Sequence, residues 1–197
     1  VDGGPEGEIV CENFNASSAT VDIRGVNVHT GSAKDTMVNA ALVAMEFNSL
    51  LPAAETPRHT ELREGFYHLT GVEGCCESAC ARYILRDHDA AKLAMRGETL
   101  MHAAKCLNEK YGEGTVTVTL RAGYRNMLDK ILPQHAHLID NAKLAARRAG
   151  VEPFMRIMRG GTDGAELSWR GLPCPNLGTG GYAFHGPYEH ISVEGMD

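Results

Sequence analysis

The segment Thr115-Val116-Thr117-Val118-Thr119-Leu120-Arg121 alternates polar and apolar side chains at every position. Successive side chains of a β-strand point to opposite faces, so this pattern predicts a strand with one buried face and one face in water. Residues 19–28 begin in the same way, with Val21 and Ile23 on one side and Asp22 on the other. The two segments therefore predict strands of a sheet that is covered on one face.

Two helices and two further strands are expected between these segments. Apolar residues recur at helical spacing after Ser32 and Asp35, either of which is a candidate N-cap. The expected elements are a helix over 35–51, strands over 66–72 and 76–86, and a helix over 88–111. The side of the second helix opposite its apolar stripe carries Lys92, Arg96, Glu98 and Lys105.

The order strand, helix, strand, strand, helix, strand is the split βαβ arrangement. It predicts an α+β fold in which an antiparallel four-stranded sheet carries two helices on one face. We place this βαββαβ module at residues 16–128 and expect the flanking residues to belong to another structure.

Composition bounds the class of protein. The chain has 197 residues, of which 43% are hydrophobic and 22% are charged, so wholesale disorder is excluded. Its 19 basic and 25 acidic residues give a net charge of −6, which argues against non-specific nucleic-acid binding. No apolar run approaches the roughly 18 residues of a membrane span. Residues 1–5 lack the features of a signal peptide and an initiating Met, and read as the middle of a longer chain.

The six cysteines do not follow a secreted disulfide pattern, because three of them crowd into residues 75–80 and the others are scattered. Cys75, Cys76 and Cys80 fit no zinc spacing either. Reduced thiols and a cytoplasmic location are therefore expected.

Glycine-rich loops dominate the C-terminal part of the chain. We expect a helix over 137–148, a short strand over 155–158 and then seven glycines between residues 160 and 181. In the loop 159–165 the glycine N–H groups either converge on an anion, or Thr162 or Asp163 caps a following helix. Residues 178–183 match the dinucleotide pattern G-x-G-x-x-A, but Gly186 and Pro187 follow too closely for the required helix.

Several side chains are candidates for chemistry, each with an ordinary alternative. His185, Glu189 and His190 cluster on a loop, and imidazole and carboxylate are the usual ligands of catalytic zinc, although loop histidines are often merely solvated. Asp2, before two glycines, is a turn residue or a ligand. His29 follows a strand and is an ordinary loop residue or a proton donor at a sheet edge.

Taken together, these segments resemble the peptidase T family, the tripeptide aminopeptidases among the dimeric two-zinc exopeptidases. The resemblance runs through the whole chain. Its main motifs are VDGGP at 1–5, NVH at 27–29, MVNA at 37–40, EGFYHL at 64–69, RD at 86–87, RGGTDGA at 159–165, GLPCPNL at 171–177, TGGY at 179–182 and HG at 185–186.

The resemblance implies a domain organisation and a reaction. Residues 16–128 would form the family's βαββαβ lid, used for dimerisation, while 1–15 and 129–197 would be segments of an α/β zinc-exopeptidase catalytic domain. Two zinc ions per full-length subunit would activate water to cleave the N-terminal peptide bond of tripeptides.

The resemblance also implies site residues, position by position. Asp2 and His185 match ligands of one zinc each. His29 matches the lid histidine that stabilises the oxyanion in the partner subunit's site. Arg86 and Arg159 match arginines that bind substrate.

Some features of the family are absent or altered. The residues that supply the general base and most metal ligands precede the position of Val1 in the family, so this fragment alone is expected to be inactive. Thr30, Asp35 and Pro187 depart from the common pattern.

The expected partners are a small peptide and a second copy of the chain, with no nucleic acid and no membrane. Two rival interpretations are a dimerisation module without chemistry and an N-acyl amino acid deacylase of the same clan.

Overall fold

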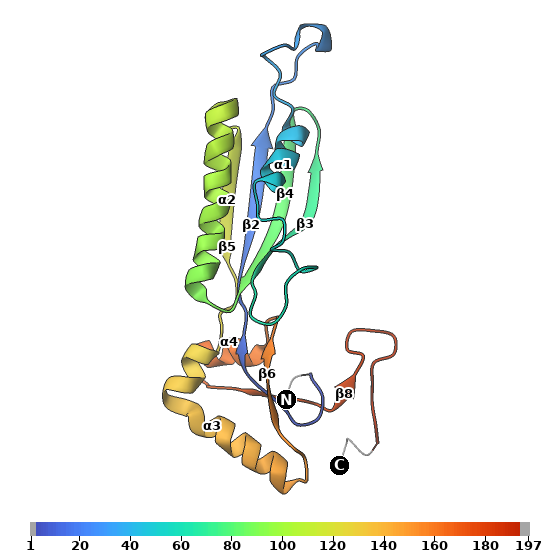
Figure 1. Cartoon of the computed structure of the whole chain (residues 1–197), viewed down its shortest axis with the longest axis vertical. Coiled ribbons are helices and arrows are strands. Elements are labelled where there is room, and N and C mark those ends of the chain that lie inside the picture. The colour runs from blue at the N-terminus through green and yellow to red at the C-terminus, as the bar shows by residue number, and fades with distance from the viewer. Residues whose placement is uncertain (1–2, 194–197) are drawn as a thin grey trace. The chain divides into compact units, whose positions relative to one another are not determined.

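The computed structural model describes residues 3–193 of the chain. The chain divides into two compact units, whose elements are labelled in Figure 1. We refer to Asn15–Gly123 as the module, and to Val1–Phe14 together with Tyr124–Asp197 as the flanking unit. The predicted lid boundaries at residues 16 and 128 stay a prediction.

A four-stranded antiparallel sheet forms the body of the module, all of whose residues the structure describes. Its strands lie in the order β3-β4-β2-β5, with β3 and β5 at the edges. The elements in chain order are β2 (Asn15–Arg24), α1 (Ala40–Ser49), β3 (Phe66–Gly74), β4 (Ser78–Asp87), α2 (Ala90–Tyr111) and β5 (Val116–Ala122). The predicted α+β fold and its order of elements are confirmed (Figure 1).

Both helices cover the same face of this sheet. Val21 of β2 and Tyr83 of β4 lie in one buried cluster with Phe47 of α1 and Leu100 of α2. The alternate residues of these strands, such as Asp22, lie on the opposite face and are exposed or half-buried. The alternation of polar and apolar residues in the sequence thus predicted the buried and the solvent-facing sides of the sheet correctly.

The first helix begins later than the sequence pattern predicts. Asp35 has a φ of 58°, which is not helical, and α1 starts at Ala40. The cap is Asn39, whose Oδ1 accepts hydrogen bonds from the N–H groups of Ala41 (3.1 Å) and Leu42 (3.3 Å). Both candidate caps, Ser32 and Asp35, were therefore wrong.

The residues before α1 form an arm instead, which we define as residues 26–38. A bridge between Val26 and Val38 closes its base through two backbone hydrogen bonds of 2.8 and 3.0 Å. Beneath the bridge, a Cβ on Gly25 would lie 1.9 Å from the carbonyl oxygen of Cys76, so only glycine fits there. The close contact fixes the arm to the β3–β4 turn.

The chain enters and leaves the module at one place. The N–H of Gly123 donates to the carbonyl of Ala16 at 2.9 Å, and Asn15 Nδ2 donates to the carbonyl of His88 at 2.9 Å. The two connecting strands are therefore hydrogen-bonded neighbours.

Among the described residues of the flanking unit, a three-stranded sheet has the order β6-β1-β7. The strands are β1 (Glu8–Asn13), β6 (Phe154–Met158, parallel to β1) and β7 (Asn176–Leu177, antiparallel to β1). All six residues of β1 are buried, and its core neighbours include Met127 and Ile131. The burial of both faces of β1 explains why no alternating pattern predicts this strand.

Two helices and a hairpin complete the described part of the flanking unit: α3 (Leu128–Arg148), α4 (Asp163–Trp169), and β8 (Gly181–Tyr182) paired with β9 (His190–Ile191). The sequence prediction found only the second part of α3, because Pro133 lies inside the helix and His135 has a non-helical φ of −126°. None of the helices in residues 3–193 combines the length and apolar character that crossing a membrane requires.

Candidate functional site

His29 lies on the arm and is exposed, as the N-terminal cap of a short 3₁₀ turn, Thr30–Ser32. Its Nδ1 accepts a hydrogen bond from the N–H of Gly31 at 3.1 Å. A ring nitrogen that accepts carries no proton, so the neutral imidazole has its proton on Nε2. The local fold therefore prepares His29 as a hydrogen-bond donor.

Arg86 lies near the end of β4, where the sheet itself positions its guanidinium. Nη1 donates to the carbonyl of Leu85 at 2.8 Å and to that of Ser17 at 3.3 Å, and the side chain is half-buried. These contacts restrict the rotamers of a side chain that would otherwise be mobile.

Arg159 follows β6 in the flanking unit, and its Cζ lies 5.0 Å from the centre of the Phe14 ring. This is the geometry of a cation–π contact, and Phe14 is fully buried. Arg159 is thus supported by an aromatic face at the start of its glycine-rich loop.

The rest of this loop shapes the backbone. Thr162 Oγ1 accepts the N–H of Gly164 at 2.8 Å and caps α4, so the capping interpretation of the loop is confirmed. Asn176 Nδ2 donates to the same oxygen at 2.7 Å. A Cβ on Gly164 would lie 2.2 Å from Asn176 Oδ1, which requires glycine at this position.

His185 lies in the turn between β8 and β9 and is exposed. Its φ is 61° and that of Ala183 is 55°, so two non-glycine residues share the left-handed conformation within three positions. The N–H of His185 donates to Glu189 Oε2 at 3.0 Å, which holds the turn closed. Such strained backbone occurs preferentially at functional sites.

The described residues do not form a zinc site on their own. Within residues 3–193 no three His, Cys, Asp or Glu side chains gather closely enough to hold a metal ion. His190 has its Nδ1 2.7 Å from the carbonyl of Tyr188 and stacks on Tyr182 at 5.4 Å. Asp2 lies outside the described residues, so the assignment of Asp2 and His185 as ligands stays a prediction.

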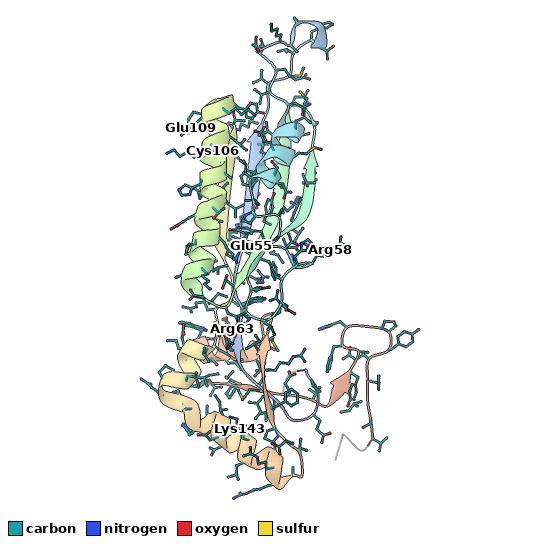
Figure 2. All side chains as sticks on the ribbon, in the orientation of Figure 1. Glu55, Arg58, Arg63, Cys106, Glu109 and Lys143 are labelled. Atoms are coloured by element: carbon teal, nitrogen blue, oxygen red, sulfur yellow. The ribbon has the colours of Figure 1, made fainter. Side chains whose placement is uncertain are left out.

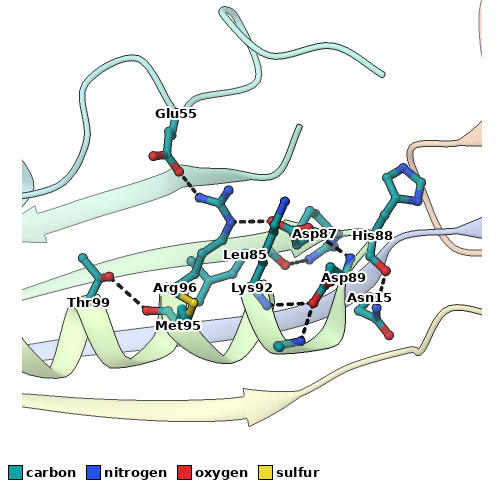
Figure 3. Close-up of polar contacts among 12 residues, drawn as sticks. Asn15, Glu55, Leu85, Asp87, His88, Asp89, Lys92, Met95, Arg96 and Thr99 are labelled. Atoms are coloured by element: carbon teal, nitrogen blue, oxygen red, sulfur yellow. Dashed lines mark hydrogen bonds and ion pairs between the residues drawn. The ribbon is translucent and has the colours of Figure 1, made fainter. Parts of the chain in front are cut away.

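The sequence prediction missed a buried ion-pair cluster in the module. Arg96 belongs to the side of α2 opposite its apolar stripe, yet only 12% of its side chain is exposed. Its Nε donates to Asp87 Oδ2 at 3.1 Å and its Nη1 donates to the carboxylate of Glu55 (Figure 3). Its Cζ also lies 5.0 Å from the centre of the Tyr67 ring. Helical periodicity gives no sign of this cluster, because Glu55 and Asp87 come from other elements.

The guanidinium of Arg96 keeps its positive charge inside the module. Burial lowers the pKa of its guanidinium, but the hydrogen bonds and charges of Glu55 and Asp87 outweigh burial and raise that pKa above its usual value. Arg96 is therefore a permanent cation inside the module.

The family model of the peptidase dimerisation domain matches residues 11–115, which is more than half of the chain. The chain belongs to the peptidase dimerisation domain family. The match extends through β2, both helices, β3 and β4, so the peptidase dimerisation domain coincides with most of the module.

Relatives with a curated name extend the match beyond the peptidase dimerisation domain to the whole chain. Peptidase T of Clostridium perfringens is 51% identical over 197 residues, which is 100% of this chain and 48% of that protein. Peptidase T of Vibrio cholerae is 49% identical and that of Halothermothrix orenii 48% identical, with the same coverage. The resemblance to peptidase T is confirmed, and the chain spans about half the length of these relatives.

Solved structures share the fold. An aminopeptidase PepT from Bacillus cereus superposes with a TM-score of 0.83 at 23% identity, covering 99% of this chain and 52% of that one. A tripeptidase from Staphylococcus aureus also gives a TM-score of 0.83, at 17% identity, covering 99% of this chain and 51% of that one. The fold of this chain is therefore shared by about half of each of these two structures.

Proposed function

We propose that this chain is the dimerisation lid and an adjoining part of the catalytic domain of a zinc aminopeptidase, which releases the N-terminal residue of tripeptides. The observation that carries the proposal is the 51% identity to a peptidase T, spread over all 197 residues. Such a match includes the loops of the flanking unit as well as the dimerisation domain.

The chain contributes one or more groups to each part of this reaction. Two zinc ions per full-length subunit would activate water and polarise the scissile carbonyl. We assign Asp2 as a ligand of one zinc ion and His185 as a ligand of the other. The remaining ligands would come from residues outside those described. Arg86 and Arg159 would bind the peptide, since a guanidinium fork suits a carboxylate.

We assign oxyanion stabilisation to His29, acting across a homodimer. Two observations support this role: Nδ1 accepts the N–H of Gly31, which leaves Nε2 as the donor, and the arm holds His29 away from the sheet, beyond the Val26–Val38 bridge. A donor placed at a developing oxyanion typically contributes about 10²–10³ in rate. The histidine would then serve the active site of the partner subunit.

The proposed partner is a second copy of the chain, bound through the module. The name of the matched family supports this, and so does the surface of the module. Leu42 and Met45 of α1 are 61% and 68% exposed, and Val72 on the edge strand β3 is 58% exposed. Because α1 packs against β3, these side chains and the open strand edge offer an apolar surface for pairing.

We further propose that the protein is cytoplasmic and that the 197 residues alone do not hydrolyse peptides. All six cysteines lie within the described residues and none forms a disulfide, as expected in a reducing compartment. We attribute the inactivity to a general base and metal ligands that the described residues do not bring together.

A chimera tests the proposal. The matching half of Clostridium perfringens peptidase T is replaced by this chain, and hydrolysis of a tripeptide is measured. We expect activity that His185→Ala abolishes and that His29→Ala lowers by about 10²–10³. His102→Ala, at an exposed position of α2, is the matched control and should leave activity unchanged.

Two rival functions give different outcomes in the same experiment. A module without chemistry is favoured by the missing metal cluster, and would give a folded, dimeric but inactive chimera. A deacylase of the same clan would hydrolyse N-acetyl amino acids in preference to tripeptides. Either result would contradict the proposed aminopeptidase.

A further inference from the structure

The segment between α1 and β3, residues 52–65, forms a strap over hollow space. A cavity of about 660 Å³ lies between the strap, the end of β4 and the start of α2, and the strap also borders a smaller hollow of about 370 Å³ beside Tyr67 and Tyr83. Of the residues in the strap, Gly65 alone is buried. Figure 2 shows Glu55, Arg58 and Arg63 along this segment. The strap is therefore largely exposed to solvent.

Arg96 lines the larger cavity and binds two carboxylates that differ in burial. The side chain of Asp87 is 3% exposed, whereas that of Glu55 is 43% exposed and comes from the strap (Figure 3). A buried charge cannot lose its partner without a large penalty, so Asp87 is the permanent counter-charge. Glu55 reaches solvent and comes from the exposed strap, so its contact with Arg96 is the one that an anion from solution can replace.

We propose that the cavity beneath the strap binds a small carboxylate anion, and that Glu55 occupies its carboxylate position as an internal competitor. The chemistry of the occupant follows from the group that Arg96 holds in the structure. A guanidinium matches a carboxylate in geometry and charge, and Lys92 adds a second cation to the wall. The volume lies within the usual range of roughly 300–1,000 Å³ for small-molecule cavities.

Binding would release the strap from α2. With Glu55 displaced, the backbone hydrogen bond from the N–H of Tyr67 to the carbonyl of Glu55, at 2.8 Å, still ties the strap to β3. The anion would thus change the position of the strap without unfolding the module. This inference does not depend on peptidase activity.

The backbone amide of Gly65 lies close enough to the ion pair to report binding at this site. A Cβ on Gly65 would lie 2.2 Å from Asp87 Oδ2 and 2.7 Å from Arg96 Nε, so the strap ends directly against the ion pair. The amide of Gly65 and the Nε–H of Arg96 should therefore respond to any anion that replaces Glu55.

The test is a titration of the ¹⁵N-labelled chain with succinate, followed by NMR at the Gly65 amide and Arg96 Nε–H signals. Sodium chloride at equal ionic strength is the reference. We expect saturable shifts with succinate, and an affinity about tenfold higher for Glu55→Gln. If Glu55 occupies the site about nine-tenths of the time, only about one-tenth of the molecules can bind the anion, and the apparent affinity is about tenfold lower.

Two variants make the result specific. Glu73→Gln removes another carboxylate that pairs with an arginine, here Arg82 at 2.6 Å on the other face of the sheet, and should bind succinate like the wild type. Lys92→Met should weaken binding several-fold. The proposal is overturned if Glu55→Gln binds no tighter than Glu73→Gln, or if sodium chloride causes the same shifts. The Glu55–Arg96 contact is then only a structural tie.

Discussion

The module and the flanking unit are both built from helices on a sheet, but they close their cores differently. Among the described residues, the core cluster of the module contains 18 buried residues, and that of the flanking unit contains seven. The edge strand β6 of the flanking unit leaves Phe154 and Met155 each 43% exposed. Because the module has the larger buried core, we expect it to be the more stable unit.

The two units can be followed separately during unfolding. The single tryptophan of the chain, Trp169, lies in α4 of the flanking unit. It is held between Arg125 and Lys130, whose cationic groups lie 3.5 and 4.4 Å from the ring centre. Tryptophan fluorescence therefore reports the flanking unit, while far-ultraviolet circular dichroism also detects α1 and α2.

The largest effect is expected for Arg96→Met in the module. The substitution leaves Asp87 buried without its counter-charge, and breaking a buried pair costs about 3–5 kcal/mol. Urea unfolding followed by circular dichroism should show this loss, with little change in the fluorescence transition.

Arg82→Met is the matched control for that change. Arg82 and Glu73 form an ion pair with side chains 51% and 68% exposed, so its loss should cost no more than about 1 kcal/mol. Equal effects of the two substitutions would mean that the buried cluster is not important for the stability of the module.

A core truncation in the flanking unit is expected to have a similar or smaller effect, of about 2–5 kcal/mol. Ile131 is fully buried, and Ile131→Ala creates a cavity next to β1. The tryptophan transition should move to lower urea while the remaining helical signal unfolds at its original midpoint. If both signals shift together, the two units unfold as one and the comparison fails.

A smaller effect is expected at the start of α1. Asn39→Ala removes the acceptor of two N–H groups and should cost about 0.5–2 kcal/mol. Asn39→Asp keeps an acceptor oxygen and should unfold close to the wild type in urea. A large loss with both variants would show that the side-chain amide has a role beyond capping.

The smallest effect concerns the tie between α1 and α2. Hydrogen bonds from Lys110 (2.7 Å) and Tyr111 (2.6 Å) lower the pKa of Glu46 from its usual 4.5. A lowered folded-state pKa gives stability that is present above the unfolded value and lost as the pH falls through the folded value.

Thermal unfolding at several pH values tests this tie. The difference in melting temperature between wild type and Glu46→Gln should be small at neutral pH and vanish as the pH falls below about 4.5. Glu109→Gln, an exposed position of α2, is the control and should show no such pH dependence. A difference that persists at low pH would assign the effect to packing.

The sequence predicted those elements whose two faces have different environments. β2 and β5 alternate because one face meets the helices and the other meets solvent, and this set the fold of the module. By contrast β1, buried on both faces, has no period to detect. The start of α1 was misplaced because the apolar spacing continues into the arm, where backbone pairing of Val26 with Val38 prevails.

The candidate site was predictable only as separate residues. Motifs identified His29, Arg86, Arg159 and His185, but two of them lie in the module and two in the flanking unit. The Arg96 cluster escaped notice because it joins a helix, a strand end and the strap. Periodicity describes one element at a time, so contacts of this kind do not show in it.

The hydrogen bond between Gly123 and Ala16 has a consequence for engineering and evolution. Because the two ends of the module are adjacent, the residues from β2 to β5 can be regarded as an insert that is attached to its host protein at one point. A few linking residues would rejoin the host chain after deletion of the module. A gene fusion would move the module into another protein with its two ends already close together. Insertion into a foreign scaffold would need only two adjacent attachment points, which surface loops readily offer.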